Sequence, residues 1–255
     1  WLTVAGVLER RRAYDLARFK NAVLGLPTTI GDHIVTRLEL EACCGRHGMA
    51  KSRDDIPVDA RGQLVAGIDW GGGGTARTVL IIGYMRSDFV FQVFRMEKFP
   101  ANEDPEHVLS SISNRCSQFR VAFIAADGGG NGHVYNRLLL DKLQSTGNLY
   151  AILYSASDHP PRQDGALWKW TVNRSASIGV LFTRVKKQKI SFPRVEESGS
   201  FLDEFACEVA EYDDINRMVR YSHPETQPDD ALHATNYALL VATRAFNSAR
   251  TYDDE

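Results

Sequence analysis

The sequence predicts an α/β fold in which a mixed sheet, with three antiparallel strands followed by parallel strands, is flanked by helices. Three observations predict this class: apolar runs of strand length, amphipathic stretches of helix length between them, and glycine-rich turns directly after two of the runs. The chain has 255 residues, of which 44% are hydrophobic. That composition is enough for a substantial core, either in one large domain or in one domain with an appendage.

The first three strands are predicted to be antiparallel. Residues 64–68 form a uniformly apolar run of strand length. Residues 78–84 and 89–96 are further strands, and the four residues 85–88 between them are typical of a hairpin turn.

Helices and strands alternate in the remainder of the chain. A helix is predicted from Asp104 or Pro105 to about Phe119, because apolar residues recur there at helical spacing. The strand at 121–126 is uniformly apolar, which favours a central, parallel position. The later predicted elements are a helix at 131–143, a strand at 150–154, a loop at 157–165, a helix at 171–187, an extended piece at 190–193, a helix at 199–208, a strand at 216–221 and a helix at 231–246.

The N-terminal residues differ in character from the rest. Gly25 and Pro27 end a charged helical pattern, residues 38–44 suggest a short helix, and residues 51–57 read as a linker. We therefore predict a linker or tail at residues 1–60 and a compact domain at residues 61–250. The start at Trp1 rather than at a methionine indicates a fragment of a longer protein.

Composition argues against several classes of protein. Lys and Arg total 30 against 32 Asp and Glu, so a nucleic-acid enzyme of this balance needs a local basic patch. The four cysteines show neither metal-type spacing nor a disulfide framework, which favours a reducing, intracellular setting. No apolar run approaches the roughly 18 residues of a membrane span, no signal peptide is present, and no P-loop motif occurs.

Three acidic positions give the strongest functional signal. Asp69 and Asp127 each follow a predicted strand directly and precede a run of glycines, while Asp229 and Asp230 open the last predicted helix. Carboxylates that converge repel one another unless a cation lies between them, and hard oxygen ligands suit Mg²⁺ or Mn²⁺. We predict all four as catalytic candidates and Asp69, Asp127 and Asp230 as metal ligands, with Asp229 as a neighbour or helix cap.

Each acid also has a purely structural explanation. Asp and Gly are common in the turns after strands, and Asp is favoured at helix N-termini by the helix dipole. One acid is enough to cap the last helix, so the presence of two adjacent acids favours a functional role for one of them. His233 shares a helix face with Asp230, and it is either a proton-transfer group or a buried histidine with satisfied hydrogen bonds. Its apolar neighbours favour the second interpretation.

Basic residues gather in two places, and we predict that they contact a DNA backbone. The structural alternative is a solvated helix C-terminus, where cations are favoured in any case. Trp168 and Trp170 lie near Arg174 in the sequence, and we predict that they pack in the core rather than stack on bases. The predicted DNA contacts are Arg174, Arg184, Lys186, Lys187 and Lys189.

The order of the predicted elements, with acids on the first and fourth strands and on a late helix, matches the ribonuclease H-like fold. Several short motifs then resemble the C-terminal nuclease domain of phage terminase large subunits, and similarity extends over residues 18–246. The motifs are Gly67-Ile68-Asp69-Trp70-Gly71, Ala126-Asp127-Gly128-Gly129-Gly130, Val172-Asn173-Arg174 and Pro228-Asp229-Asp230-Ala231, preceded by a segment at 19–27 similar to the one that follows the packaging ATPase.

The resemblance implies an Mg²⁺- or Mn²⁺-dependent endonuclease, with two ions, that cuts concatemeric viral DNA during genome packaging. Its acidic triad corresponds to Asp69, Asp127 and either Asp229 or Asp230. One ion, on Asp69 and Asp127, would activate water, and the other, on Asp69 and Asp230, would stabilise the leaving oxygen. The implied partners are double-stranded DNA, an ATPase domain of the same polypeptide, a small terminase subunit and a portal protein, in the host bacterial cytoplasm, with no membrane.

Other functions share parts of this pattern. The glycine runs after Asp69 and Asp127 also look like the two phosphate loops of sugar-kinase or actin-like ATP-binding proteins. A junction resolvase or transposase of the same superfamily is a nearer alternative. A non-catalytic DNA-binding module with a decayed site is disfavoured by the complete set of acids.

Overall fold

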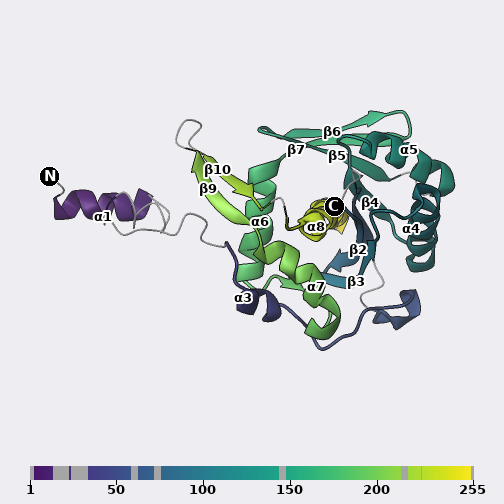
Figure 1. Cartoon of the computed structure of the whole chain (residues 1–255), viewed down its shortest axis with the longest axis horizontal. Helices are drawn as coiled ribbons and strands as arrows, with labels where there is room; N and C mark the ends of the chain where they lie inside the picture. The colour runs from purple at the N-terminus through teal and green to yellow at the C-terminus, as the bar shows by residue number, and fades with distance from the viewer. Residues whose placement is uncertain are drawn as a thin grey trace.

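An eight-stranded mixed sheet forms the centre of the structure (Figure 1). The computed structural model describes residues 3–13, 23, 34–58, 63–71, 76–143, 148–213, 218–224 and 226–253. The strands follow the spatial order β6-β7-β5-β4-β1-β2-β3-β8. This arrangement confirms the predicted fold class, because antiparallel strands on one side of β1 continue into parallel strands on the other.

The strands on either side of β1 differ in direction. β1 (Val65–Asp69) pairs antiparallel with β2 (Thr78–Met85), which pairs antiparallel with β3 (Phe91–Phe99). On the other side, the parallel strands are β4 (Phe123–Asp127), β5 (Leu149–Ser155) and β7 (Leu167–Asn173). The edges are β6 (His159–Asp164), antiparallel to β7, and the short β8 (Ile190–Ser191), parallel to β3.

Helices cover both faces of the sheet (Figure 1). One face carries α4 (Pro105–Phe119) and α5 (Gly132–Leu143), and the other carries α6 (Arg174–Lys186), α7 (Val195–Ala206) and α8 (Asp230–Asp253). Side chains alternate between two hydrophobic clusters: on β2, Leu80 and Ile82 face α4, whereas Val79 and Ile81 face α8. The remaining elements are α1 (Val4–Ala13), α3 (Arg37–Glu41), the short 3-10 helix η1 (Arg53–Asp55), and the hairpin β9 (Val209–Asp213) and β10 (Met218–Ser222).

The structure corrects the predicted loop at 157–165 and the predicted helix start at residue 171. Residues 159–164 form β6, an edge strand that can hold Pro160 and Pro161 because an edge needs only one side of its backbone to pair. The β-branched Thr171 lies in β7, and α6 begins only at Arg174. Asn173 sets that boundary, because its Oδ1 accepts a hydrogen bond from the amide of Ala176 at 2.9 Å.

Strand β9 was not predicted from the sequence. The helix expected at 199–208 is α7, which begins and ends earlier, and residues 209–213 turn into β9 directly after it. The described part of the strand expected at 216–221 lies in β10, which pairs with β9. Figure 1 shows this hairpin beside α6, away from the large sheet.

Part of the predicted tail packs against the domain. Val35, Leu40 and Cys43 belong to the cluster beneath α6 and α7, and Ile56 belongs to the opposite cluster. The predicted division at residue 61 stays a prediction, but the described residues 34–56 share the core of the sheet. Residues 19–22 and 24–27 of the packaging-like segment lie outside the described residues.

Three expectations from the sequence can be compared with the structure. All four cysteines lie among the described residues and are free thiols. Among the described helices, none combines the length and apolar character needed to cross a membrane. Trp168 and Trp170 both pack against Tyr150, as expected for core residues.

The closest approach in the fold lies between β1 and α8. A Cβ atom placed on Gly67 would lie 2.0 Å from the carbonyl oxygen of Ala234 and 2.5 Å from the amide nitrogen of Ala238. Two backbones therefore meet here with no side chain between them. Only glycine permits this contact, and the contact fixes the position of α8 along β1.

We expect Gly67→Ala to destabilise the protein by at least about 2 kcal/mol, because α8 must move away from the sheet. Urea unfolding measures this change. The matched control is Gly199→Ala in α7, where the nearest atom to an added Cβ is the flexible guanidinium tip of Arg37 at 3.1 Å. The control should be neutral or slightly stabilising, and equal losses in both variants would contradict the importance of the β1–α8 contact.

Candidate metal centre

Two carboxylates lie side by side at the C-terminal edge of the sheet. β1 and β4 run parallel with Ile68 opposite Ala126, so Asp69 and Asp127 occupy the next position in register. Neighbouring strands are about 4.8 Å apart, which brings the two side chains to one locality. The amide of Gly129 donates to Asp127 Oδ1 at 3.0 Å and orients that carboxylate.

The start of α8 supplies the third carboxylate. Ala234 lies against Gly67, and Asp230 is one helical turn before Ala234, while Asp69 is two residues beyond Gly67. The amide of Arg77 donates to Asp230 Oδ2 at 3.0 Å and holds the side chain. Asp230 is itself buried, with 8% exposure.

The electrostatics of these acids follow from their convergence. Burial raises the pKa of Asp69 well above its usual range, and the charges of Asp230 and Asp127 raise it further, in that order. Burial also raises the pKa of Asp127 and of Asp230, against the lowering effect of their backbone hydrogen bonds. The structure thus places Asp127 and Asp230 near enough to act electrostatically on Asp69, and the role of the three acids as ligands stays a prediction.

A carboxylate that sequence reasoning missed lies next to Asp230. Glu204 of α7 accepts a hydrogen bond from the amide of Ala231 at 2.6 Å and forms an ion pair with Lys98 of β3. It therefore caps α8 and ties that helix to two other elements. No local sequence pattern marks Glu204, because all of its partners are distant in the chain.

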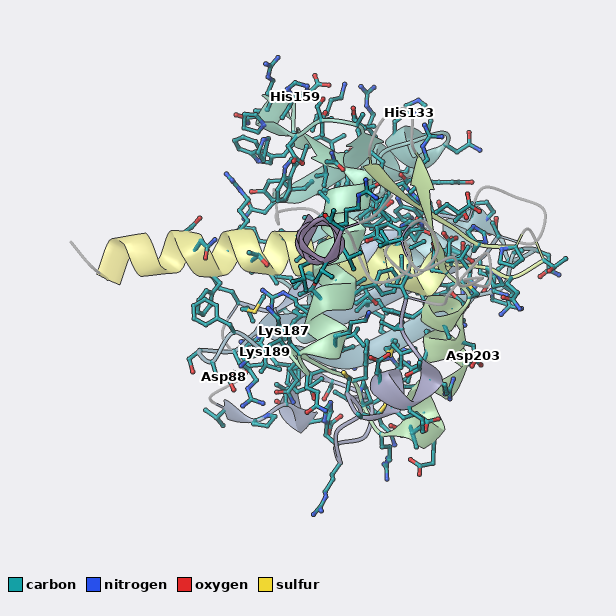
Figure 2. All side chains as sticks on the ribbon, turned by 90° about the vertical axis from the view of Figure 1, so that its left-hand side faces the viewer. Asp88, His133, His159, Lys187, Lys189 and Asp203 are labelled. Carbon is teal, nitrogen blue, oxygen red and sulfur yellow. The ribbon has the colours of Figure 1, made fainter. Side chains whose placement is uncertain are left out.

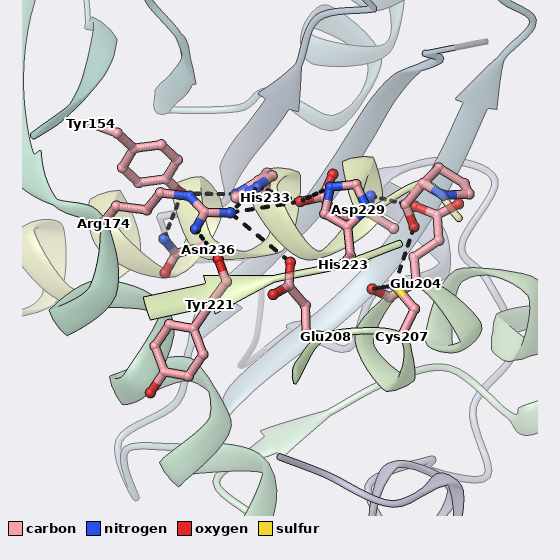
Figure 3. A network of polar contacts seen from close by, with 12 residues as sticks. Tyr154, Arg174, Glu204, Cys207, Glu208, Tyr221, His223, Asp229, His233 and Asn236 are labelled. Carbon is pink, nitrogen blue, oxygen red and sulfur yellow. Dashed lines mark hydrogen bonds and ion pairs between the residues drawn. The ribbon is translucent and has the colours of Figure 1, made fainter. Parts of the chain in front are cut away.

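Asp229 does not share the surroundings of Asp230. Its Oδ2 lies 2.8 Å from His233 Nε2, 3.3 Å from His223 Nε2 and 3.8 Å from Arg174 Nη2 (Figure 3). Burial favours a higher pKa for Asp229, but the hydrogen bond and charge of His233 and the charge of His223 lower it to about 2. Adjacent residues at the start of α8 thus make different direct contacts, although the charges of Asp229 and His233 also act on Asp230.

The polar network around Asp229 extends to α6 and the β9–β10 hairpin (Figure 3). Arg174 Nη1 donates to the carbonyl oxygen of Tyr221 at 2.6 Å, and its Nη2 lies 4.0 Å from Glu208 Oε1. His233 Nδ1 lies 3.1 Å from the hydroxyl oxygen of Tyr154. His233 is therefore buried and hydrogen-bonded, as its apolar neighbours predicted, and it also contacts an acid of the site.

The predicted DNA contacts fall into two groups. Arg174 belongs to the acidic network, whereas Lys186, Lys187 and Lys189 are exposed at the end of α6. Arg184 lies between them and is partly buried, since its Nη1 donates to the carbonyl oxygen of Phe89 at 2.8 Å. Figure 2 shows Lys187 and Lys189 beside Asp88 on one face of the molecule.

An open groove of about 670 Å³ follows α6 and is lined by three of the predicted DNA contacts. Lys187, Lys189 and Arg184 line one part, and Ser175, Ala176 and Tyr221 line the part next to Arg174. The groove therefore runs from the exposed lysines toward the acidic region. Gly72, Gly73, Gly74 and Thr75 of the first glycine-rich loop, on which the ATP-binding interpretation partly depends, lie outside the described residues.

The order and directions of the strands define the fold as ribonuclease H-like. No protein-family model and no curated protein sequence matches the chain. Among solved structures, it is similar to the nuclease domain of the large terminase subunit of bacterial virus Sf6, with TM-score 0.57 and 13% identity over 81% of this chain and 97% of that one.

Two other solved structures support the same fold. The large terminase nuclease of thermophilic phage G20c with bound magnesium has TM-score 0.54 and 13% identity over 84% of this chain and 98% of that one. The large terminase of another thermophilic bacteriophage has TM-score 0.54 and 12% identity over 94% of this chain and 52% of that one. The resemblance seen in the sequence motifs is thus confirmed at the level of fold.

We expect Asp69→Asn to raise the melting temperature of the metal-free protein at pH 8, and to raise it less at pH 5. Because the folded-state pKa of Asp69 is raised, its stabilising contribution is present below the usual carboxyl pKa of about 4 and is lost as pH rises. Asparagine cannot ionise, so the variant does not lose stability as pH rises. Each kcal/mol of repulsion that is relieved raises the melting temperature by about 2–4 °C. Thermal unfolding at both pH values with EDTA present measures the effect.

Asp164→Asn is the matched control for this measurement. Asp164 is exposed on β6, and the hydrogen bond from Lys169 lowers its pKa, so its removal should give no gain at pH 8. If Asp69→Asn lowers the melting temperature at pH 8 as much as at pH 5, the acids do not repel one another in the folded protein.

Proposed function

We propose that the chain is a metal-dependent DNA endonuclease domain of a terminase large subunit. The observation that carries the proposal is the convergence of Asp69, Asp127 and Asp230 from two parallel strand ends and one helix start. The similarity in fold to terminase nuclease domains supports the same assignment.

The donor set fits Mg²⁺ or Mn²⁺. All three side chains offer oxygen, and burial and the charges of the other two acids raise the pKa of Asp69, so a bound cation would stabilise its carboxylate. Asp69 interacts with both other acids and is therefore the ligand that two ions would share. Bound ions of this kind activate water and stabilise the leaving oxygen of a phosphodiester.

Of the two adjacent acids, we assign Asp230 rather than Asp229 as the ligand. Asp230 has the largest charge effect on Asp69, and its position is fixed by the amide of Arg77. Asp229 instead has two histidines and Arg174 as neighbours, which already balance its charge.

DNA would approach along the groove beside α6. The distance from Arg174 to Lys186 along the helix axis is about 18 Å, enough to follow several phosphates of one strand. The other parts of the proposal are those of a packaging motor: an ATPase domain in the same polypeptide, a small terminase subunit and a portal protein, within the host bacterial cytoplasm.

We expect the purified protein to nick or linearise supercoiled plasmid with Mn²⁺ or Mg²⁺, and not with EDTA. Asp69→Asn and Asp230→Asn should each lose at least about 100-fold in cleavage rate, because each removes a charge that holds a metal ion. Agarose electrophoresis of time courses measures the rates, and Asp164→Asn is the control on an exposed acid.

Asp229→Asn tests the assignment within the pair and should lose less activity than Asp230→Asn. The reverse order would move the ligand to Asp229. Full metal-dependent cleavage by Asp69→Asn would overturn the proposed site, and stabilisation of an inactive protein by ATP would favour the kinase-like alternative.

We expect Lys187→Ala/Lys189→Ala to weaken DNA binding and to lower the slope of log K against log salt by about 2, since two phosphate contacts are removed. Binding to a labelled duplex in Ca²⁺, over a range of salt concentrations, measures both effects. The matched control is Lys51→Ala/Arg137→Ala, which removes two exposed charges far from the groove. If both double variants change DNA affinity and its salt dependence equally, DNA does not bind along the groove.

A further inference from the structure

We propose that Glu208, Asp229 and His233 form a second metal site, which takes a transition-metal dication such as Zn²⁺, Mn²⁺ or Co²⁺. One ligand atom from each of these side chains lies within 4.8 Å of the other two. The site shares no side chain with the oxygen-only cluster of Asp69, Asp127 and Asp230, although Asp229 and His233 lie near enough to act electrostatically on those acids. Its existence does not depend on nuclease activity.

Glu208 is the side chain that points to a missing ligand. Glu208 is fully buried, and neither of its carboxylate oxygens has a hydrogen-bond partner among the described residues. Figure 3 shows the carboxylate turned toward Arg174 and Asp229. A buried carboxylate without hydrogen bonds is strongly unfavourable, and buried charges are normally paired or coordinate metals.

Arg174 does not meet this need. Its Nη2 is 4.0 Å from Glu208 and 3.8 Å from Asp229, beyond hydrogen-bond distance for both. The hydrogen bond of its Nη1 goes to the backbone of Tyr221 instead. Its Nη2 also lies 3.5 Å from His233 Nε2, so the guanidinium is near all three ligand side chains and makes no short hydrogen bond to either carboxylate.

The histidines are held as metal-binding histidines commonly are. His223 Nδ1 lies 2.6 Å from the carbonyl oxygen of Gln227, which places the ring proton on Nδ1 and leaves Nε2 directed at Asp229. Such a backbone partner fixes the tautomer of a metal-ligating imidazole. His233 has an equivalent partner, because its Nδ1 faces the hydroxyl group of Tyr154 while its Nε2 faces Asp229.

The donor chemistry selects the class of ion. A set of one imidazole and two carboxylates suits borderline transition metals, whereas Mg²⁺ and Ca²⁺ prefer oxygen alone. His223 Nε2, 3.3 Å from Asp229, is near enough to add a second nitrogen. An ion here would join the start of β9, the start of α8 and the segment after β10, which clamps the small hairpin onto the main domain.

The experiment uses Asp69→Asn/Asp127→Asn protein, in which the oxygen-only cluster is disabled, with Co²⁺ as the probe. We expect about one bound Co²⁺ per chain by equilibrium dialysis, with visible absorption bands of a nitrogen-ligated ion, and competition by Zn²⁺ but not by Mg²⁺. Adding Glu208→Gln should weaken Co²⁺ binding at least tenfold, since one ligand charge is lost. Glu211→Gln, which changes an exposed acid three residues further along in β9, is the matched control and should bind as the parent does.

Absence of stoichiometric Co²⁺ from the parent protein, or a spectrum without nitrogen ligation, overturns the proposal. A proton shared between Glu208 and Asp229, with Arg174 as the only cation, would then explain the cluster. The parent spectrum decides the question even if Glu208→Gln fails to fold. Plasmid cleavage by the wild-type protein in Mg²⁺ tests the nuclease proposal separately, so either proposal can fail without the other.

Discussion

The contact between Gly67 and α8 is the constraint on which the acidic region depends. Because the backbone of β1 meets the backbone of α8 directly, the helix cannot slide or rotate without a steric clash. That contact fixes where Asp230 lies relative to Asp69, and Glu204 fixes the helix end from the other side through Ala231. Positions set by main-chain contacts are stiffer than those set by flexible side chains, which suits a site that must hold several like charges together.

The start of α8 divides the acids between two chemical environments. Asp229 and Asp230 are adjacent in sequence, yet successive residues of a helix point about 100° apart. Asp230 therefore faces the strand ends with Asp69 and Asp127, and Asp229 makes its direct contacts with His223, His233 and Arg174. Two adjacent residues at the start of α8 thus belong to two groups of side chains. The group of Asp230 offers carboxylate oxygens as ligands, and the group of Asp229 offers carboxylate oxygens and imidazole nitrogens.

The sequence predicted the elements whose signals are local. The apolar runs predicted β1 and β4, and helical spacing predicted α4. Asp69 and Asp127 were found because each directly follows one of the two apolar runs. Prediction was wrong at residues 157–165, where the prolines of an edge strand look like a loop, and it missed β9 after α7. Glu204 and Glu208 were not found because their importance comes from tertiary contacts, which leave no periodic pattern in the chain.

The chain order of the acidic residues has a consequence for biosynthesis. Asp69 and Asp127 leave the ribosome before Asp230, whose helix follows about 100 residues after Asp127, at synthesis rates of about 5–20 residues per second. A nascent chain therefore carries an incomplete site for several seconds, with the face of β1 at Gly67 uncovered. The contacts of α8 with β1, β2 and β4 span long stretches of chain, so their formation is a late, high-contact-order event, and the acidic cluster is complete only after it.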